Sequence, residues 1–578
     1  MLGSMALRAT VEELRDLLVK RLAVIDAETF ERAASVAVRL RLPLEQALVE
    51  RGRIPLRFLL AQVAESWGVP YVDLKPSDVD PAALRAVPEE YARRHGIIAF
   101  GRRGNRLQVA MVDPRDRTRA DDLRGAAPIV ERWLADENAV QRALLLYRND
   151  VRQIMERTAT GEAHSLEVAD AGPATIELLD CVLAVAAVTR ASDVHIEPFE
   201  HEVIVRYRID GVLADRLLLA PVALIPLVAR IKVLSGMRID DRRSPQDGRF
   251  TADLGGLALD FRVSSLPTHW GEKIVLRVLT REAGFLDLDD LGLRAADHET
   301  LKTTLARPFG LVLVTGPTGS GKSTSLYAML SHLRAERQAI VNISTIEDPV
   351  EFPMPRVNQV TVNPAFGVDF AAGLRALLRQ DPDIIMVGEI RDQETAGIAV
   401  RSALVGRLVL STLHTNDAVS AVARLFDMGV EAFLLASTLT LVIGQRLVRR
   451  TCEACRESVD VDARILAVLR GRPDFDSTVA GLRAEGVLGG GSDPFADVRL
   501  FRGRGCEQCA GTGHRGRVGI YESFTVDDEA RALMMERRPA AEIRRAAMAR
   551  GMRTMLQDGF AKALLGETTV EEIYRVTG

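Results

Sequence analysis

The sequence predicts a multidomain α/β protein with a mostly parallel sheet near its centre. One reason is the alternation of buried strand, loop and helix that repeats from about residue 300. Another is the length of 578 residues, which corresponds to several folded units rather than one. A third is the ordinary globular composition, with 47% apolar and 27% charged residues, which supplies enough apolar side chains for sizeable cores.

The charge balance and the apolar runs bear on partners and location. Acidic residues exceed basic residues by 79 to 75, so binding of nucleic acid by bulk electrostatics is not expected. The longest apolar run, residues 217–229, contains two prolines and is shorter than the ~20 residues that span a bilayer. The first twenty residues contain Glu12, Glu13 and Asp16 and therefore lack the apolar core of a signal peptide. We expect a cytoplasmic protein that reaches a membrane only through partners.

Changes of pattern along the chain indicate the domain boundaries. Leucines at helical spacing predict a helical N-terminal domain over residues 1–75, and mixed apolar and helical stretches predict a small α/β domain over 76–155. A polar linker over 156–172 precedes an apolar helix containing Cys181, which we expect to serve core packing. The remaining predicted parts are an α+β domain at 173–295, the parallel-sheet core at 296–451, a cysteine-containing element at 452–525 and a helical subdomain at 526–578.

The string GPTGSGKST follows an apolar run at 311–314 and precedes a helical pattern. A glycine-rich loop in this setting curls so that successive backbone amides point at one centre, where they hold phosphate oxygens. The lysine adds positive charge for the β and γ phosphates, and the serine hydroxyl after it suits Mg²⁺. The sequence therefore predicts a site for a nucleoside triphosphate and Mg²⁺ made of Gly316, Pro317, Thr318, Gly319, Ser320, Gly321, Lys322, Ser323 and Thr324.

Three polar side chains are expected at the carboxyl ends of neighbouring strands. The apolar run 340–343 leads to Glu347, a second at 384–387 leads to Glu389, and a third at 408–411 leads to His414. Ligands of such sheets sit at the carboxyl ends of the strands, so all three side chains are expected to face the phosphates. A carboxylate there can orient the attacking water or hold Mg²⁺. The alternative for each residue taken alone is a surface loop without a catalytic role.

Four of the five cysteines form two C-x2-C pairs, Cys452 with Cys455 and Cys506 with Cys509. Four thiolates complete a closed tetrahedral site for a structural Zn²⁺ ion, whereas a reducing cytosol does not favour disulfides. The 50 residues between Cys455 and Cys506 are interpreted as an insertion that leaves the two pairs close in space. Reduced cysteines without metal are the alternative.

With these motifs, the chain resembles the secretion ATPases of the GspE/PilB family, which power type II secretion and type IV pilus assembly. The strings ISTIEDPVEF, LLRQDPDIIMVGEIRD, STLHTN and GQRLVRRTCEAC carry the similarity together with GPTGSGKST. They correspond to the family's Walker A loop, its Asp box (Glu347 to Glu351), its atypical Walker B segment (Asp383 to Glu389) and its His box (His414). The resemblance implies a homo-hexameric ring of ATP-hydrolysing subunits, each with a RecA-like core preceded by a PAS-like α+β domain.

The resemblance also implies arginines supplied by that preceding domain, where ASDVHIEP and VRYRIDGVL are similar to the family. Apolar and polar residues alternate there, which places Arg206 and Arg208 on one face of a strand. Arg206 is the first candidate for a charge-stabilising finger and Arg208 the second; the alternative is that both pair with acids on that face. The family often has a second arginine about fifteen positions after the first, but that position is Pro221 when counted from Arg206. Further basic candidates are Arg249, Arg262 and Arg277.

Residues 31–75 resemble the small helical N-terminal domain of the family, which binds cyclic di-GMP in some members. When the sequence is aligned on Gly52, Pro43, Leu44, Glu45 and Ser66 occupy the ligand-binding positions, so we do not expect cyclic di-GMP to bind. The resemblance implies instead that this region docks on the cytoplasmic domain of an inner-membrane secretion or pilus component, and that an inner-membrane platform protein is a further partner. The alternative is a module that only stabilises the ring.

The resemblance implies an ATPase that drives pseudopilus assembly and so protein export by a type II secretion system, with type IV pilus assembly as the alternative. Retraction motors of the family generally lack the long N-terminal region and the tetracysteine element. The balanced charge, without basic stretches interleaved with aromatic residues, disfavours a nucleic-acid translocase. Lys322, Glu347, Glu389 and His414 disfavour a scaffold without turnover. We expect Glu347 to act as the base for the attacking water and Glu389 to be the carboxylate on the side of Mg²⁺. The two roles could also be exchanged.

Overall fold

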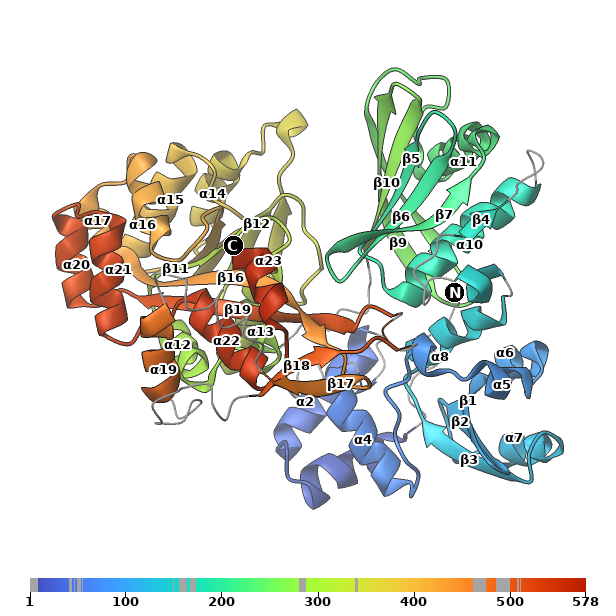
Figure 1. Ribbon diagram of the computed structural model, residues 1–578. Helices are drawn as coiled ribbons and strands as arrows, with labels where there is room; N and C mark the ends of the chain where they lie inside the picture. Colours follow the sequence, from blue (N-terminus) through green and yellow to red (C-terminus); the bar gives the residue numbers. More distant parts are fainter. Residues whose placement is uncertain are drawn as a thin grey trace. The chain divides into compact units, whose positions relative to one another are not determined.

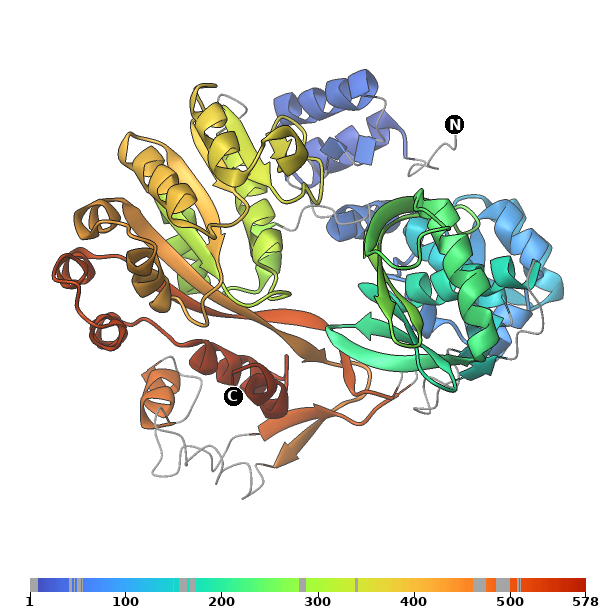
Figure 2. The same ribbon diagram turned by 90° about the horizontal axis from the view of Figure 1, so that it is seen from above.

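The structure is a computed structural model, shown in Figure 1 and, turned by 90°, in Figure 2. The chain divides into two compact units, one of residues 1–284 with 505–512 and the other of residues 285–504 with 513–578. No helix in the described part of the chain is long and apolar enough to cross a membrane. The described residues are 9–40, 44–45, 47–48, 54, 56–148, 150–154, 164–166, 173–279, 287–337, 341–460, 475–484, 499–506, 509 and 511–577.

The first unit begins with a group of helices that has its own apolar core. Leu14, Leu18, Phe30 and Leu59 are fully buried in that core, which confirms the helical character expected from the leucine spacing. The first helix starts with a capping box: the Thr10 hydroxyl accepts a hydrogen bond from an N–H of that turn, and the Thr10 N–H donates to a glutamate carboxylate. The elements are α1 (Val11–Arg15), the π-helical turn η1 (Asp16–Arg21), α2 (Ala27–Leu40) and α4 (Leu56–Ser66).

A small sheet of order β1-β2-β3 follows these helices. Arg115 ties the two parts together, because its guanidinium lies 4.1 Å from the ring centroid of Trp67 and 3.1 Å from a carboxylate oxygen of Glu13. The elements are η2 (Pro76–Asp78), α5 (Pro81–Arg85), α6 (Glu89–His95), β1 (Ile97–Arg103), β2 (Arg106–Met111), α7 (Arg117–Asp121), η3 (Asp122–Gly125), β3 (Ile129–Leu134), α8 (Glu137–Leu144) and η4 (Leu145–Tyr147).

The rest of the first unit is a sheet of order β4-β7-β6-β5-β10-β9-β8, on whose apolar face two helices pack. The buried Tyr207 hydroxyl of this face donates to the carbonyl of Val182 in α10 at 3.1 Å. Cys181 of the same helix is buried, as expected for core packing, and burial raises the pKa of its thiol. The elements are β4 (His164–Leu166), α10 (Pro173–Thr189), β5 (Asp193–Pro198), β6 (Val203–Ile209), β7 (Val212–Leu219), η5 (Pro221–Ala223), α11 (Leu224–Ser235), β8 (Gln246–Asp253), β9 (Ala258–Thr268) and β10 (Gly271–Leu279).

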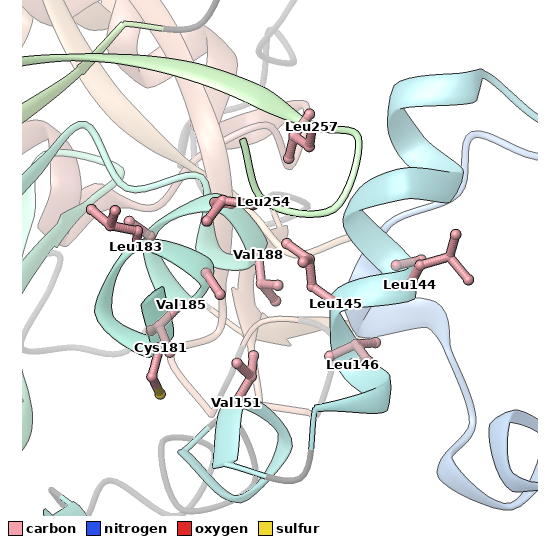
Figure 3. Packing of buried hydrophobic residues seen from close by; sticks show 14 of the residues in the cluster. Leu144, Leu145, Leu146, Val151, Cys181, Leu183, Val185, Val188, Leu254 and Leu257 are labelled. Atoms are coloured by element: carbon pink, nitrogen blue, oxygen red, sulfur yellow. The ribbon is translucent and has the colours of Figure 1, made fainter. Parts of the chain in front are cut away.

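The hairpin between β8 and β9 joins the small sheet and the larger one in a shared core. Its turn has positive φ at Gly255 and Gly256, which are 75° and 103°. Leu254 and Leu257 flank these glycines and belong to the same buried cluster as Leu145 of η4 (Figure 3). Of the expected linker at 156–172, the structure describes residues 164–166, which form β4 and pair with β7; the others lie outside the described residues.

The second unit is built on a sheet of order β13-β12-β14-β15-β11-β16-β19, in which β19 alone among the described strands of this sheet is antiparallel to its neighbour. Strands β11, β14 and β15 are buried along their whole length, as is usual for parallel strands covered on both faces. The predicted parallel core is thereby confirmed. Its strands are β11 (Gly310–Thr315), β12 (Ile343–Glu347), β13 (Asn358–Thr361), β14 (Ile384–Val387), β15 (Leu408–Leu413), β16 (Leu439–Thr451) and β19 (His514–Thr525).

Helices cover both faces of this sheet (Figures 1 and 2). One apolar cluster gathers side chains of α14 to α17 and α20, and another gathers those of α12 and α13. The bounds are η6 (Leu288–Leu291), α12 (Ala295–Leu305), α13 (Lys322–Glu336), η7 (Pro364–Phe366), α14 (Phe370–Leu378), α15 (Gln393–Leu404), α16 (Ser420–Asp427), α17 (Ala432–Thr438), β17 (Arg456–Asp460), α19 (Phe475–Ala484), β18 (Arg499–Gly503), α20 (Asp528–Met535), α21 (Ala540–Ala549), α22 (Met555–Leu564) and α23 (Val570–Thr577).

One strand lies later than its apolar run suggested. The run at 340–343 predicted a strand there, but Ile340 lies outside the described residues and β12 begins only at Ile343. Glu347 is therefore the last residue of the strand rather than a residue beyond it. The buried Thr345 in mid-strand is polar, and its hydroxyl is satisfied by donating to Oε1 of Glu347 at 2.5 Å. Hydrophobicity alone misplaced the strand because its polar side chains bond internally.

Candidate nucleotide site

The predicted phosphate loop runs from the end of β11 to the start of α13, as expected. Gly316, Gly319 and Gly321 have φ of 154°, 80° and 88°, all in the region that favours glycine. A Cβ atom at Gly316 would lie 2.4 Å from the backbone oxygen of Gln445. The loop can therefore follow this course only with glycine at that position. Its exposed residues are Pro317, Thr318 and Gly319, and Ser323 and Thr324 are exposed in the first turn of α13.

Lys322 places its charge inside the loop. The side chain is 8% exposed, and Nζ donates to the carbonyl oxygens of Gly316 at 2.8 Å and Pro317 at 3.0 Å. Burial lowers the pKa of Lys322, and the negative charge of Glu389 opposes that effect. The buried Ser320 hydroxyl has no hydrogen-bond partner among the described residues. A buried cation and an unpartnered hydroxyl within one curl of backbone suit an anionic ligand such as a polyphosphate.

Gln445 of β16 packs against the phosphate loop and the helix that follows it. Sequence patterns did not identify this residue as part of the site. Its Oε1 accepts a hydrogen bond of 2.7 Å from the Ser325 hydroxyl of α13. Its Nε2 would lie 2.9 Å from a Cβ atom at Gly321, and the side chain is buried. The residue stands in the string GQRLVRR that carried part of the resemblance, but nothing in its local pattern distinguished it from a strand residue in the core.

The two glutamates have different surroundings. Glu347 is 4% exposed, and its carboxylate accepts hydrogen bonds from the Tyr327 hydroxyl, from Thr345 and, at 3.1 Å, from Nε2 of Gln359. These donors occupy both carboxylate oxygens. The hydrogen bonds of the Glu347 carboxylate therefore lead into the core and not to Lys322.

Glu389 lies nearer the charge of the phosphate loop. Its carboxylate is 2.5 Å from Nη2 of Arg391 and 3.4 Å from Nε2 of His414, and it acts electrostatically on Lys322. The side chain of Glu389 is 15% exposed and that of His414 is 49% exposed. The structure thus brings Lys322, Glu389 and His414 together, as the carboxyl-end rule predicted. Asp383, at the start of the expected Walker B segment, lies instead at the amino end of β14.

Arg206 and Arg208 share one face of β6, as expected, and both pair with acids on that face. Arg206 lies 2.9 Å from Asp215 and 3.2 Å from Glu197. Arg208 lies 3.4 Å from Asp193. This is the alternative that the sequence left open for these two arginines, and their catalytic role stays a prediction.

Three other arginines form a row across the same sheet. Arg249 of β8 is the cross-strand partner of Arg262 of β9, which is in turn the partner of Arg277 of β10. Like charges directly opposite one another destabilise a sheet. One member of the row is paired, because Nε of Arg277 lies 3.3 Å from Oδ1 of Asp193. The row therefore gathers three guanidinium groups on one face of the sheet.

A spacing signal for this row was present in the sequence. Arg262 and Arg277 are 277 − 262 = 15 positions apart. This is the spacing that the resemblance implies for two fingers, and it was missed because the count began at Arg206.

The four paired cysteines come together despite the insertion between them. Their Sγ atoms all lie within 4.8 Å of one another, which confirms that the two pairs are close in space. The Sγ atoms of Cys506 and Cys509 are 3.7 Å apart. Four ligands at Zn–S distances of 2.3 Å on a tetrahedron are about 3.8 Å apart, so the donor set fits Zn²⁺.

Comparisons with known proteins agree with this geometry. The family model described as "Type II/IV secretion system protein" matches residues 167–575, and that of the "MshEN domain" matches residues 67–153. The type IV pilus assembly ATPase PilB of Myxococcus xanthus is 40% identical over 547 residues, which are 91% of this chain and 92% of that protein. The type II secretion system protein HxcR of Pseudomonas aeruginosa is 46% identical over 412 residues, 71% of this chain and 79% of that protein.

The PilB of Thermus thermophilus is 40% identical over 543 residues, which are 92% of this chain; the chain spans 58% of the length of that relative. The MshEN match begins downstream of most of the segment in which cyclic di-GMP ligands were sought. In that segment Pro43 and Gly52 lie outside the described residues, whereas Leu44, Glu45 and Ser66 lie within them. The absence of cyclic di-GMP binding therefore stays a prediction.

The secretion-system match covers more than half of the chain, and it coincides with the phosphate loop, the carboxylates at the sheet edge and the paired cysteines. This chain therefore belongs to the type II/IV secretion system protein family, as its motifs predicted, and it is an ATPase.

Proposed function

We propose that this ATPase works as a homo-hexameric ring that drives the assembly of a pseudopilus and so protein export by a type II secretion system. The observation that carries the proposal is the extent of the similarity. A type II secretion protein is 46% identical over 412 residues, which are 71% of the chain. Assembly of a type IV pilus is the second candidate, because two PilB proteins align with 91% and 92% of the chain. The N-terminal region would then dock on an inner-membrane component, next to a platform protein.

The client can be identified in the native cell by replacing the chain with its Lys322→Ala variant. The variant loses the charge that holds the phosphates, so we expect ATP hydrolysis to fall to background. Loss of proteins from the culture supernatant with normal surface pili supports secretion, and loss of pili with normal secretion supports pilus assembly. A strain in which both remain normal would contradict the proposal.

Within the site we propose that Glu389 orients the attacking water, which exchanges the two roles first assigned to the glutamates. Support comes from the different burial of the two carboxylates. Three internal donors occupy Glu347, whereas Glu389 acts on Lys322 and lies beside the exposed His414. Ser323, exposed at the start of α13, is the proposed ligand for Mg²⁺, which when bound neutralises charge on the β and γ phosphates. Glu347 then holds the strand end in place.

A pair of matched variants tests this division. Because general-base catalysis contributes about 10²–10⁴-fold, Glu389→Gln should lower kcat by that factor while ATP still binds. Glu347→Gln keeps the shape of the side chain and should lower kcat far less. The measurement is steady-state hydrolysis together with binding of a fluorescent ATP analogue. A larger loss of kcat in Glu347→Gln than in Glu389→Gln would restore the original assignment.

We further propose that the row of Arg249, Arg262 and Arg277 supplies the charge-stabilising arginines, in preference to Arg206 and Arg208. The support is electrostatic. Arg206 contacts two carboxylates and Arg277 contacts one, and the register of β8, β9 and β10 places the three cations of the row side by side. An arrangement that costs stability in the sheet is retained where a polyanion can neutralise it.

Arg277→Gln should therefore lower kcat by about 10³-fold or more, the lower end of the range for an arginine finger, with assembly unchanged. Arg206→Gln, the matched control from the same sheet face, should keep most of the activity. Both variants are measured as assembled protein, with size-exclusion chromatography beside the ATPase assay. Near-normal turnover of Arg277→Gln combined with inactive Arg206→Gln would favour the first candidate again.

Finally, we propose that the tetracysteine cluster holds one structural Zn²⁺ ion. Untreated protein should then contain about one equivalent of zinc, since four thiolates form a closed site. Cys506→Ser should hold less than half of that amount, whereas Cys181→Ala, which alters the fifth cysteine, should leave the zinc content unchanged. Plasma emission analysis of both variants makes the measurement. Less than half an equivalent in the parent protein would refute a resident zinc ion.

A further inference from the structure

A partly buried charge network joins the C-terminal helices to the loop that carries His414. Arg544 of α21 lies 2.5 Å from Oδ1 of Asp417 and 3.5 Å from Oε2 of Glu522. Glu522 of β19 is 2% exposed, and its Oε1 accepts a hydrogen bond of 3.1 Å from the Ala418 N–H. One arginine therefore bridges two carboxylates that come from different elements.

Asp417 is the centre of this network, three residues after His414. Its side chain holds the first residue of α16, because Oδ1 accepts from the Ser420 N–H at 2.8 Å and Oδ2 accepts from the Ser420 hydroxyl at 2.7 Å. Its carbonyl accepts from the Thr415 hydroxyl at 2.9 Å and from that of Thr315 at 3.4 Å. Thr315 is the last residue of β11, directly before the phosphate loop. Asp417 thus contacts the strand that precedes the phosphate loop, at Thr315, and the loop that carries His414, at Thr415.

A contribution to the stability of the folded state does not by itself explain this network. Burial raises the pKa of Glu522, and the nearby charge of Asp417 acts in the same direction, so the cluster is costly without its arginine. A buried ion pair can often be replaced by apolar residues at no loss of stability, but such a replacement does not hold a neighbouring loop in one position. In this protein, the ion pairs of Arg544 hold the loop between His414 and α16 in one position.

We infer that Arg544 is a positioning residue for ATP hydrolysis, which fixes the His414 loop through Asp417 and Glu522. This inference rests on the proposed function, in which Glu389 orients the attacking water, and it gives a role in hydrolysis to His414, whose Nε2 lies 3.4 Å from the Glu389 carboxylate. The helix pair α20 and α21 thereby acts on the nucleotide site without touching it. Rearrangement of α21 by a partner would change the rate of hydrolysis and leave the grip on ATP intact.

The test is a double-mutant cycle on the full-length assembled protein. Arg544→Gln should lower kcat by roughly 2- to 30-fold, the usual range for a coupling residue, with KM for ATP unchanged. The same change made in a His414→Ala background should cause no further loss, because both variants disturb one loop. Losses that multiply in the double variant would overturn the inference.

Two further variants separate positioning from folding. Arg550→Gln is the matched control, since Arg550 ends the same helix and its side chain, 57% exposed, pairs with Asp527 and Glu529 on the surface; its kcat should equal that of the parent. If Arg544→Gln is unstable, Arg544→Gln combined with Glu522→Gln removes the unpaired buried charge and should keep the low kcat. Normal kcat in that folded double variant would overturn the inference.

The outcome for His414→Ala separates the role of His414 from that of Arg544. If His414→Ala lowers kcat and Arg544→Gln does not, the role of His414 stands and the positioning role of Arg544 fails. If His414→Ala leaves kcat unchanged, the proposed role of His414 fails, and the route from Arg544 through that loop fails with it.

Discussion

The arrangement of the second unit depends on one buried cation, the Lys322 ammonium inside the curled phosphate loop. Two loop carbonyls accept its hydrogen bonds, and burial lowers its pKa. A cation withdrawn from water in this way needs negative charge nearby, and Glu389 supplies part of it at the end of the next strand but one. The remaining positive potential is what a polyphosphate can neutralise. The glycines of the loop are needed because Gln445 leaves no room for a side chain at Gly316.

The same constraint explains why two similar glutamates have different surroundings. Both stand at the carboxyl ends of neighbouring strands, since β12 pairs with β14. Glu347 ends its strand inside the core, where Tyr327 and Gln359 donate to it. Glu389 follows its strand by two residues, which carries its carboxylate out to Arg391 and His414. A shift of two positions along the chain therefore decides which carboxylate meets the charge of the loop.

The sequence predicted those features of the fold that short stretches of the chain determine by themselves. The parallel core, the phosphate loop and the alternation that sets Arg206 and Arg208 on one face all follow from short periodic patterns or from short motifs. The arginine row does not, because Arg249 and Arg262 meet only through the register of a hairpin. The start of β12 was misplaced for a related reason: internal hydrogen bonds allow polar residues in a buried strand, and hydrophobicity does not register them.

Strand β16 shows how one element can serve two parts of a site. Successive side chains of a strand point to opposite faces, so Gln445 and Gly444 meet different neighbours. Gln445 contacts the phosphate-loop helix at Ser325, whereas a Cβ atom at Gly444 would lie 3.0 Å from the backbone nitrogen of Ala418. That nitrogen is the one that Glu522 of the paired strand β19 binds. A displacement of the β16–β19 pair would therefore move the phosphate loop and the His414 loop together, and Arg544 is one of the side chains that join the C-terminal helices to this pair.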